Sequence, residues 1–128
     1  MFQRRPGVKQ IVAVVDDDVS VRESLENLLA EFGYAVGAFS SAEEFLASDR
    51  VGRTGCLILD IALPEMSGPE LQRELNDRNQ QIPIIYITAL ENERLHAQLI
   101  SDGAVECLMK PFSETALLEA LQRAGAQP

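Results

Sequence analysis

Short apolar runs alternate with helically periodic segments along the chain, and this alternation limits the fold more than any other feature of the sequence. Continuous apolar runs of strand length are typical of strands covered on both faces, as in parallel sheets. A weaker run at 34–39 is interrupted by Gly37, which favours a strand at the sheet edge. The four stronger runs are 11–15, 56–59, 83–87 and 105–109.

Helical spacing of apolar residues fills the intervals between these runs. The first helix is predicted to begin at a capping box of Ser20 and Glu23 and to stop at Gly33. Strict alternation of strands and helices favours right-handed crossovers, and hence an α/β fold with a doubly wound, five-stranded parallel sheet and helices on both faces. The other helices are predicted to open at Ser41, to follow Gly68 with Pro69 at the first position, to end near Gly103 and to run from about Ser113.

The length and charge of the chain limit its organisation and its partners. The 128 residues fit one domain, which we place at 10–124, between a flexible N-terminal segment, 1–9, and a C-terminal tail, 125–128. A net charge of −9 argues against direct binding of this chain to nucleic acid. No signal peptide or long apolar run is present in the sequence, so we expect a cytoplasmic protein with no membrane partner. Cys56 and Cys107 lie in apolar runs and favour reduced thiols over a disulfide or a zinc site.

Polar residues follow four of the five predicted strands. In an open parallel sheet, ligands bind beyond the carboxyl ends of the strands, so these residues should meet at one edge although they lie far apart in the sequence. This convergence is the strongest functional signal in the sequence. The residues are Asp16, Asp17 and Asp18 after the first strand, and Asp60, Thr88 and Lys110 after three later strands.

Carboxylates gathered at one edge repel one another, by about 4 kcal/mol per pair at ~4 Å and an effective dielectric constant of roughly 20. A divalent cation would offset the repulsion, and few carboxylates with room for water favour Mg²⁺ over Ca²⁺. Lys110 and Thr88 would then face an anionic group, and a phosphoryl group carried by an aspartate as an acyl phosphate fits best. Each residue alone also has an ordinary explanation: Asp18 as a helix N-cap, Thr88 as a structural strand end and Lys110 as a surface lysine.

Four motifs, VVDDD, LILDIALPEMSG, YITA and MKPF, occur together in this order. Over 10–124 the chain resembles the receiver domains of two-component response regulators, and in particular those of FixJ-type transcriptional regulators. The resemblance implies a flavodoxin-like sheet with strand order 2-1-3-4-5. It further implies Asp60 as the phosphoacceptor, Mg²⁺ (with Mn²⁺ as a substitute) held by Asp16, Asp17, Asp60 and the carbonyl of Ala62, phosphoryl contacts from Thr88 and Lys110, and a cis peptide bond before Pro111.

The same resemblance implies a partner and a slow reaction. A receiver takes its phosphoryl group from a phosphohistidine on a sensor histidine kinase or phosphotransfer protein. It later hydrolyses the acyl phosphate, and it does not turn over external substrates. The side chains of Ala62 and Leu90 occupy the positions that influence access of water in the family. His96, the sole histidine, is predicted to be an exposed residue of the fourth helix and not a phosphoryl relay.

One position departs from the family pattern. Receivers couple the residue at Thr88 to an aromatic side chain on the fifth strand that turns inward on phosphorylation, and Cys107 occupies that place here. Either Thr88 and the fourth helix transmit the signal without an aromatic residue, or the switch is muted. Cys107 is equally well explained as a small buried residue.

The leading hypothesis is a phosphorylation switch that changes the surface of the fourth helix, fifth strand and fifth helix for a partner or a second copy of the chain. One alternative is a phosphorylation-independent interaction module with a receiver fold, suggested by Cys107. Another is a phosphatase that uses Asp16 and Asp18 as nucleophile and acid. The sequence leaves open whether an output domain belongs to the full-length protein, as in a longer transcription factor.

Overall fold

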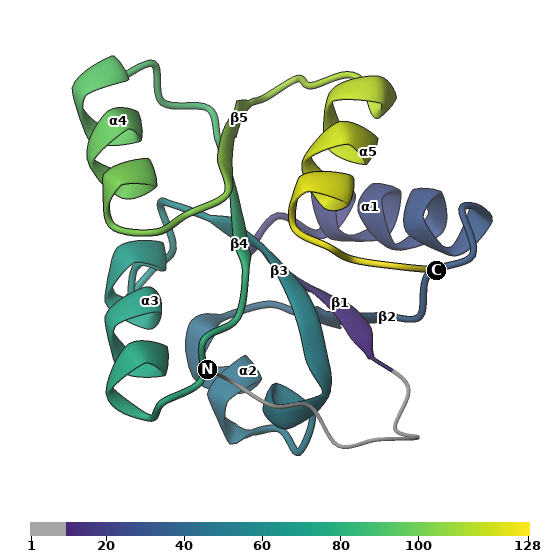
Figure 1. Ribbon diagram of the computed structural model, residues 1–128, viewed down its shortest axis with the longest axis horizontal. Coiled ribbons are helices and arrows are strands. Elements are labelled where there is room, and N and C mark those ends of the chain that lie inside the picture. Colours follow the sequence, from purple (N-terminus) through teal and green to yellow (C-terminus); the bar gives the residue numbers. More distant parts are fainter. Residues whose placement is uncertain (1–9) are drawn as a thin grey trace.

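A parallel sheet forms the centre of the fold. The computed structural model describes residues 10–128 of the chain. The expectation for 1–9 therefore lies outside the described residues. The described sheet has five strands in the order β2-β1-β3-β4-β5, and every neighbouring pair is parallel (Figure 1). The predicted order and the edge position of the weak strand are confirmed. The strands are β1 (Ile11–Val15), β2 (Val36–Phe39), β3 (Thr54–Asp60), β4 (Ile84–Thr88) and β5 (Glu106–Met109).

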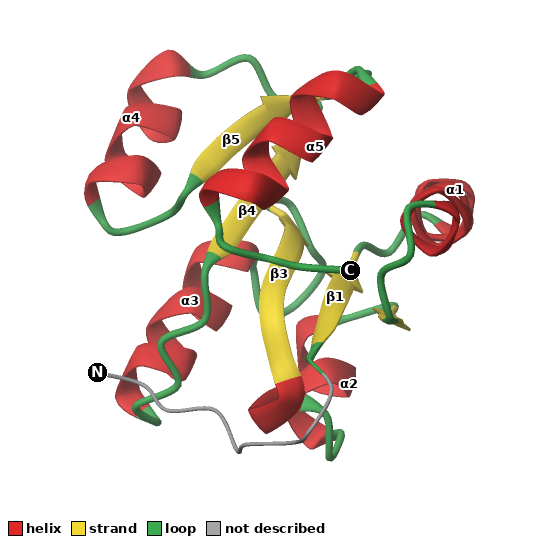
Figure 2. Cartoon of the chain, turned by 45° about the vertical axis from the view of Figure 1, so that its right-hand side comes forward, coloured by secondary structure: helices red, strands yellow, loops and turns green. Residues whose placement is uncertain are grey.

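Helices cover both faces of the sheet, as predicted. α1 and α5 lie on one face, and α2, α3 and α4 lie on the other (Figure 1 and Figure 2). Within the described chain, no helix is both long and apolar enough to cross a membrane. The elements are α1 (Val19–Glu31), α2 (Ala42–Ala47), α3 (Gly68–Asp77), α4 (Glu93–Ser101), α5 (Glu114–Arg123) and a short 3-10 helix, η1 (Val51–Arg53), which the sequence did not predict.

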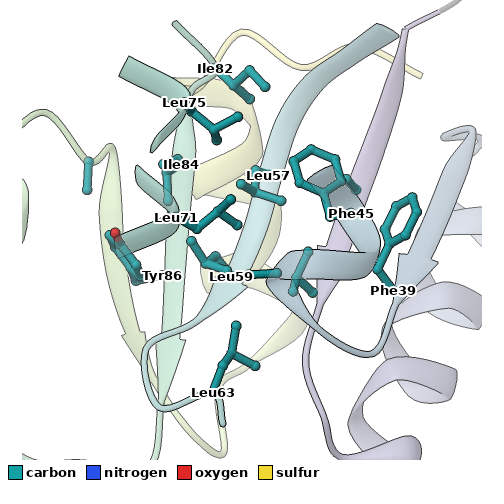
Figure 3. Packing of buried hydrophobic residues seen from close by; sticks show 14 of the residues in the cluster. Phe39, Phe45, Leu57, Leu59, Leu63, Leu71, Leu75, Ile82, Ile84 and Tyr86 are labelled. Atoms are coloured by element: carbon teal, nitrogen blue, oxygen red, sulfur yellow. The ribbon is translucent and has the colours of Figure 1, made fainter. Parts of the chain in front are cut away.

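Alternate residues of each strand point into two separate hydrophobic clusters, which explains why the strands are apolar throughout. The cluster under α2, α3 and α4 contains an edge-to-face pair, Phe39 and Phe45, whose ring centroids lie 5.2 Å apart (Figure 3). α3 adds Leu71 and Leu75 to this cluster, both essentially inaccessible. Full burial of each leucine stabilises the packing by roughly 1.5–3 kcal/mol, which holds α3 against the sheet.

The helix ends follow local hydrogen bonding, and one predicted start is wrong. Asp18 is the N-cap of α1, because its carboxylate accepts from the N–H groups of Ser20 and Val21. Ser20 already lies inside the helix, so the predicted capping box with Glu23 does not form. The ordinary explanation of Asp18 as a helix N-cap is confirmed. The N-cap therefore lies two residues before Ser20, the predicted one.

The other predicted ends agree more closely with the structure. Ser41 and Ser113 cap α2 and α5, and Gly33 and Gly103 adopt positive φ angles of 91° and 114° just after α1 and α4. α3 begins one residue earlier than predicted, at Gly68, behind a capping box of Ser67 and Glu70.

Gly68 closes the β3–α3 connection, and we expect Gly68→Ala to destabilise the domain. A Cβ atom there would lie 2.6 Å from the carbonyl oxygen of Asp60 and 3.0 Å from Cε1 of Tyr86. Overpacking of this kind costs about 1–3 kcal/mol, which urea unfolding would measure as a lower midpoint. Gly52→Ala is the matched control, because a Cβ at Gly52 has no neighbour within 4 Å. Equal midpoints for the two variants would contradict this account.

Candidate functional site

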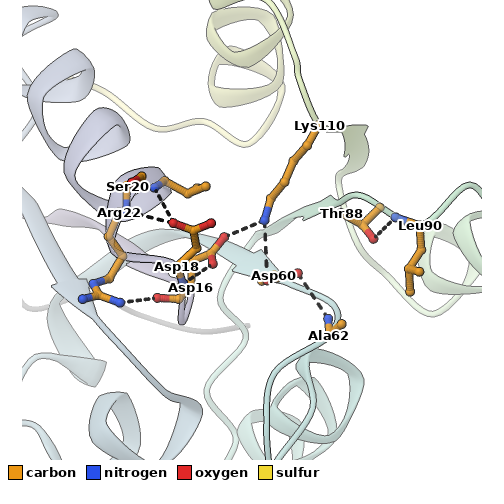
Figure 4. Close-up of polar contacts among 10 residues, drawn as sticks. Asp16, Asp18, Ser20, Arg22, Asp60, Ala62, Thr88, Leu90 and Lys110 are labelled. Carbon is orange, nitrogen blue, oxygen red and sulfur yellow. Dashed lines mark hydrogen bonds and ion pairs between the residues drawn. The ribbon is translucent and has the colours of Figure 1, made fainter.

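The predicted convergence at the carboxyl edge of the sheet is confirmed (Figure 4). Asp16 follows β1, Asp60 ends β3, and Lys110 follows β5. The Lys110 ammonium nitrogen lies 2.9 Å from Oδ2 of Asp16 and 3.5 Å from Oδ2 of Asp60. Lys110 is therefore no ordinary surface lysine, because it joins the ends of three strands across 94 positions of sequence.

Three of the four predicted acidic residues form a cluster. One carboxylate oxygen from each of Asp16, Asp17 and Asp60 lies within 4.8 Å of the others. Asp16 and Asp60 are buried, and Asp17 is exposed. Asp18 does not belong to this cluster, because its side chain caps α1. The donor set fits Mg²⁺, a hard cation that is commonly held by few carboxylates and keeps several of its waters.

Burial and neighbouring charges shift the proton affinities of the central pair. Desolvation raises the pKa of Asp60, and the charge of Asp16 raises it further, against the opposing effect of Lys110. Burial by itself would lower the pKa of Lys110. The hydrogen bond to Asp16 and the charge of Asp60 outweigh burial, so the pKa of Lys110 lies above its ordinary value. The lysine thus keeps its proton beside the carboxylates.

Backbone groups hold the two buried carboxylates in place. The N–H of Ala62 donates to Oδ1 of Asp60 at 3.2 Å, and the N–H of Asp18 donates to Oδ1 of Asp16 at 2.9 Å. Ala62 therefore lies beside the carboxylate of Asp60, while the role of its carbonyl as a metal ligand stays a prediction. The Lys110–Pro111 peptide bond is cis, the isomer that the resemblance implied.

Thr88 lies at the same edge, and its hydroxyl oxygen is bonded to the β4–α4 connection. Its Oγ1 accepts from the N–H of Leu90 at 2.9 Å, and Thr88 is fully buried. Leu90 is 50% exposed, and its side chain lies on the side of Thr88 away from Lys110 (Figure 4). His96 is on α4 as predicted, with Nε2 3.0 Å from the Leu90 carbonyl oxygen.

Cys107 is half-buried and packs against the cluster under α3 and α4, whereas Cys56 is fully buried. Burial raises the pKa of the Cys107 thiol to about 11, with a further contribution from the charge of Glu106. The thiol is therefore protonated at neutral pH and acts as a small packing residue. Its direct partner on β4 is Tyr86, a fully buried aromatic residue.

Sequence reasoning missed two polar contacts, one at the site and one in the core beneath α3. Arg22, on α1, donates from Nη1 to the carbonyl oxygen of Asp16 at 2.7 Å (Figure 4). Gln72, on α3, accepts from the buried Tyr86 hydroxyl at 2.6 Å. Arg22 lies six positions after Asp16, where the first turns of a predicted helix can fold back on the strand end. That spacing was the one available signal.

The fold and the acidic cluster together define a class of protein, the doubly wound α/β domains with an acidic site at the carboxyl ends of the strands. Residues 12–122 match the response regulator receiver domain family, and the chain belongs to that family. The predicted resemblance is thereby confirmed.

Relatives and solved structures agree with this assignment. The chain is 45% identical over 115 residues to nodulation protein W of Bradyrhizobium diazoefficiens, covering 90% of this chain and 51% of that protein. It is 42% identical over 114 residues to the transcriptional regulatory protein FixJ of Rhizobium meliloti, covering 89% and 56%. The crystal structure of FixJ-N matches with a TM-score of 0.82 at 40% identity, over 91% of this chain and 93% of that one. The chain thus spans about half the length of these curated relatives.

We expect Asp17→Asn to weaken Mg²⁺ binding and Asp18→Asn to leave it nearly unchanged. Both variants lose one negative charge, but only Asp17 contributes an oxygen to the cluster. Asn also retains the N-cap function of Asp18. Loss of a ligand should weaken binding by about 10-fold or more, because changes to outer-shell partners alone commonly cost that much. Calorimetric titration with Mg²⁺ measures both affinities, and equal losses would place the ion elsewhere.

Proposed function

We propose that this chain is the phosphoacceptor of a two-component phosphorelay. In this proposal Asp60 takes a phosphoryl group from a phosphohistidine on a sensor histidine kinase or phosphotransfer protein, in a reaction that requires Mg²⁺. The observation that carries the proposal is the placement of one buried carboxylate, Asp60, within the acidic cluster and 3.5 Å from the Lys110 ammonium nitrogen. A nucleophile, a cation site and a phosphoryl partner thus lie within one small region.

The residues divide the chemistry among themselves. A carboxylate oxygen of Asp60 attacks phosphorus, the bond from phosphorus to the histidine nitrogen breaks, and its electron pair stays with the imidazole. Asp16, Asp17, Asp60 and the carbonyl of Ala62 would hold Mg²⁺, which when bound offsets the negative charge of the phosphoryl oxygens.

Lys110 and Thr88 would bind the phosphoryl oxygens. The protonated Lys110 already lies beside Asp60 and would donate to one phosphoryl oxygen. Thr88 would donate its hydroxyl hydrogen to another, and because the same oxygen accepts from the N–H of Leu90, a turn of this side chain toward the phosphate would disturb the β4–α4 connection. Slow hydrolysis of the acyl phosphate would return the chain to its starting state. We assign no turnover of external substrates to it.

An apolar groove of about 480 Å³ between α1 and the β5–α5 connection is bordered by Lys110 and Phe112. A donor protein that reaches Asp60 would therefore lie against this groove, because Lys110 contacts both. The relatives include a transcriptional regulatory protein, and we place the relay in the cytoplasm with transcription as its output. The matched region covers only 51% of nodulation protein W. Transcription as the output is therefore proposed for a longer protein that contains this receiver, and not for the receiver alone.

The output of the switch would be the surface formed by α4, β5 and α5. Ile100 on α4 and Met109 on β5 are 43% and 36% exposed, so apolar groups are available there for a partner or a second copy. A shift from 1:99 to 99:1 between two states requires about 5.5 kcal/mol of differential binding. A few charge-assisted hydrogen bonds to a phosphoryl group reach that value, at roughly 1.5–3 kcal/mol each.

The other two candidate functions have less support. A phosphatase would need Asp18 as an acid beside the nucleophile, but the Asp18 side chain caps α1. A phosphorylation-independent module is favoured only by the absence of an aromatic side chain at Cys107. The acidic cluster and Lys110 would have no stated role in such a module, so we retain it as the outcome that a negative phosphorylation test would support.

We expect acetyl phosphate with Mg²⁺ to add one phosphoryl group to the wild-type chain, and Asp60→Asn to abolish the addition. Asn has no carboxylate oxygen to attack phosphorus. Intact-mass spectrometry measures the adduct, and removal of Mg²⁺ with EDTA should prevent it. Asp77→Asn, an exposed position at the end of α3, is the matched control and should react like the wild type. No adduct on the wild type, or an adduct that survives in Asp60→Asn, would disprove the proposal.

Beryllofluoride with Mg²⁺ should convert the chain from monomer to dimer, as measured by light scattering, because it mimics the bound phosphoryl group. Ile100→Lys should prevent this conversion by placing a charge in the α4 surface. Ala47→Lys adds the same charge at an exposed apolar residue of α2 and should still dimerise. If both variants dimerise normally, the interface is not this surface. If the wild type stays monomeric, the switch serves another partner.

A further inference from the structure

The backbone of Asp16 is held from α1 as well as from the sheet. Asp16 is fully buried, and each of its polar groups has a partner. Its N–H donates to the carbonyl oxygen of Phe39 at 3.2 Å, and its two carboxylate oxygens accept from Asp18 and Lys110. Its carbonyl oxygen accepts from Nη1 of Arg22 at 2.7 Å, the shortest of these contacts (Figure 4).

The contact from Arg22 fixes a particular peptide unit. The Asp16 carbonyl belongs to the peptide that joins Asp16 to Asp17, and a peptide unit is planar. Holding its oxygen therefore fixes the plane from which both side chains leave the backbone. Both of these side chains belong to the acidic cluster, and Asp17, being exposed, has less packing of its own to hold it.

Arg22 does not act as a counter-ion for the cluster. Among the described residues it forms no ion pair with any carboxylate, and its guanidinium group donates to the backbone carbonyl of Asp16. A guanidinium group near a cation site disfavours the cation through its charge. Any favourable effect of Arg22 on the bound ion must therefore come from geometry, and the two effects have opposite signs.

We propose that Arg22 is a positioning residue of the divalent-cation site, which holds the Asp16–Asp17 peptide so that both carboxylates reach one ion. This inference rests on the proposed function, because it takes Asp16 and Asp17 as the residues that hold Mg²⁺. Without Arg22, the carbonyl of a fully buried residue loses its partner, and the peptide is free to turn. The Asp17 carboxylate then spends less time where the ion binds.

The sign of the change in Mg²⁺ affinity tests the inference. Loss of the positive charge alone predicts that Arg22→Gln binds Mg²⁺ more tightly. Loss of positioning predicts that it binds Mg²⁺ about 10-fold more weakly, as for other outer-shell partners of metal sites. Calorimetric titration of the folded variant decides between them. Arg78→Gln is the matched control, because it removes an equal charge from an exposed ion pair on the far side of the domain and should leave the affinity unchanged.

Two further measurements separate positioning from a general loss of stability. Arg22→Lys keeps a charged donor and should recover part of the lost affinity. In amide NMR spectra of metal-free Arg22→Gln, the signals of Asp16 and Asp17 should shift, while those of α3 stay in place. Tighter or unchanged binding by Arg22→Gln would overturn the inference, and so would unchanged Asp16 and Asp17 signals.

Failure of this inference is distinguishable from failure of the proposed function. If wild type takes up phosphate at Asp60 and Arg22→Gln binds Mg²⁺ normally, only the role of Arg22 is wrong. If wild type binds no Mg²⁺, both are wrong. A phosphorylation defect of Arg22→Gln that disappears at high Mg²⁺ would support positioning, because a damaged acceptor would not recover when the ion is supplied in excess.

Discussion

The repulsion between Asp16 and Asp60 is the constraint on which the carboxyl edge of the sheet depends. β1 and β3 are neighbours in register up to Val15 and Leu59, so the carboxylates that follow cannot separate without disturbing the strand pairing. Two like charges a few ångströms apart cost about 4 kcal/mol at an effective dielectric constant of roughly 20. Lys110 offsets part of this cost by contacting both carboxylates from the end of β5. The acidic site thus depends on the pairing of β1 with β3 and on the position of β5, from which Lys110 reaches both carboxylates.

The same loops that carry the acids also begin the helices. Asp18 caps α1 while its own N–H holds the carboxylate of Asp16. On the other side of the site, the N–H of Gly68 bonds to the carbonyl of Ile61, which ties the start of α3 to the end of β3. The start of each helix is therefore bonded to a strand-end loop, so a change in either loop would alter helix stability and carboxylate position together.

The strands and the meeting of Asp16, Asp60 and Lys110 could be predicted from the residues, because apolar runs mark strand ends and parallel winding aligns those ends. The strand order came from the family resemblance alone. What could not be predicted is which of several suitable groups bonds to a given backbone atom. Asp18 and Ser20 are both good N-caps, and the loop geometry decides between them. Arg22 and Gln72 bond to a carbonyl and a phenol across the fold, and such contacts leave no periodic pattern in the sequence.

The surroundings of Cys107 indicate which groups near the carboxyl edge of the sheet can change partners most easily. Its partner on β4, Tyr86, fills the layer beside it, and burial raises the pKa of that phenol, which keeps its proton and donates to Gln72. Turning this ring would break a buried hydrogen bond at a cost of about 1–3 kcal/mol. The contact of the Leu90 carbonyl with His96 is exposed, so water can replace it at little cost, and the bond from the Leu90 N–H to Thr88 is partly buried. In the proposed switch, a response to phosphate at Asp60 should therefore begin in the β4–α4 connection, which is bonded to Thr88, and not in an aromatic side chain.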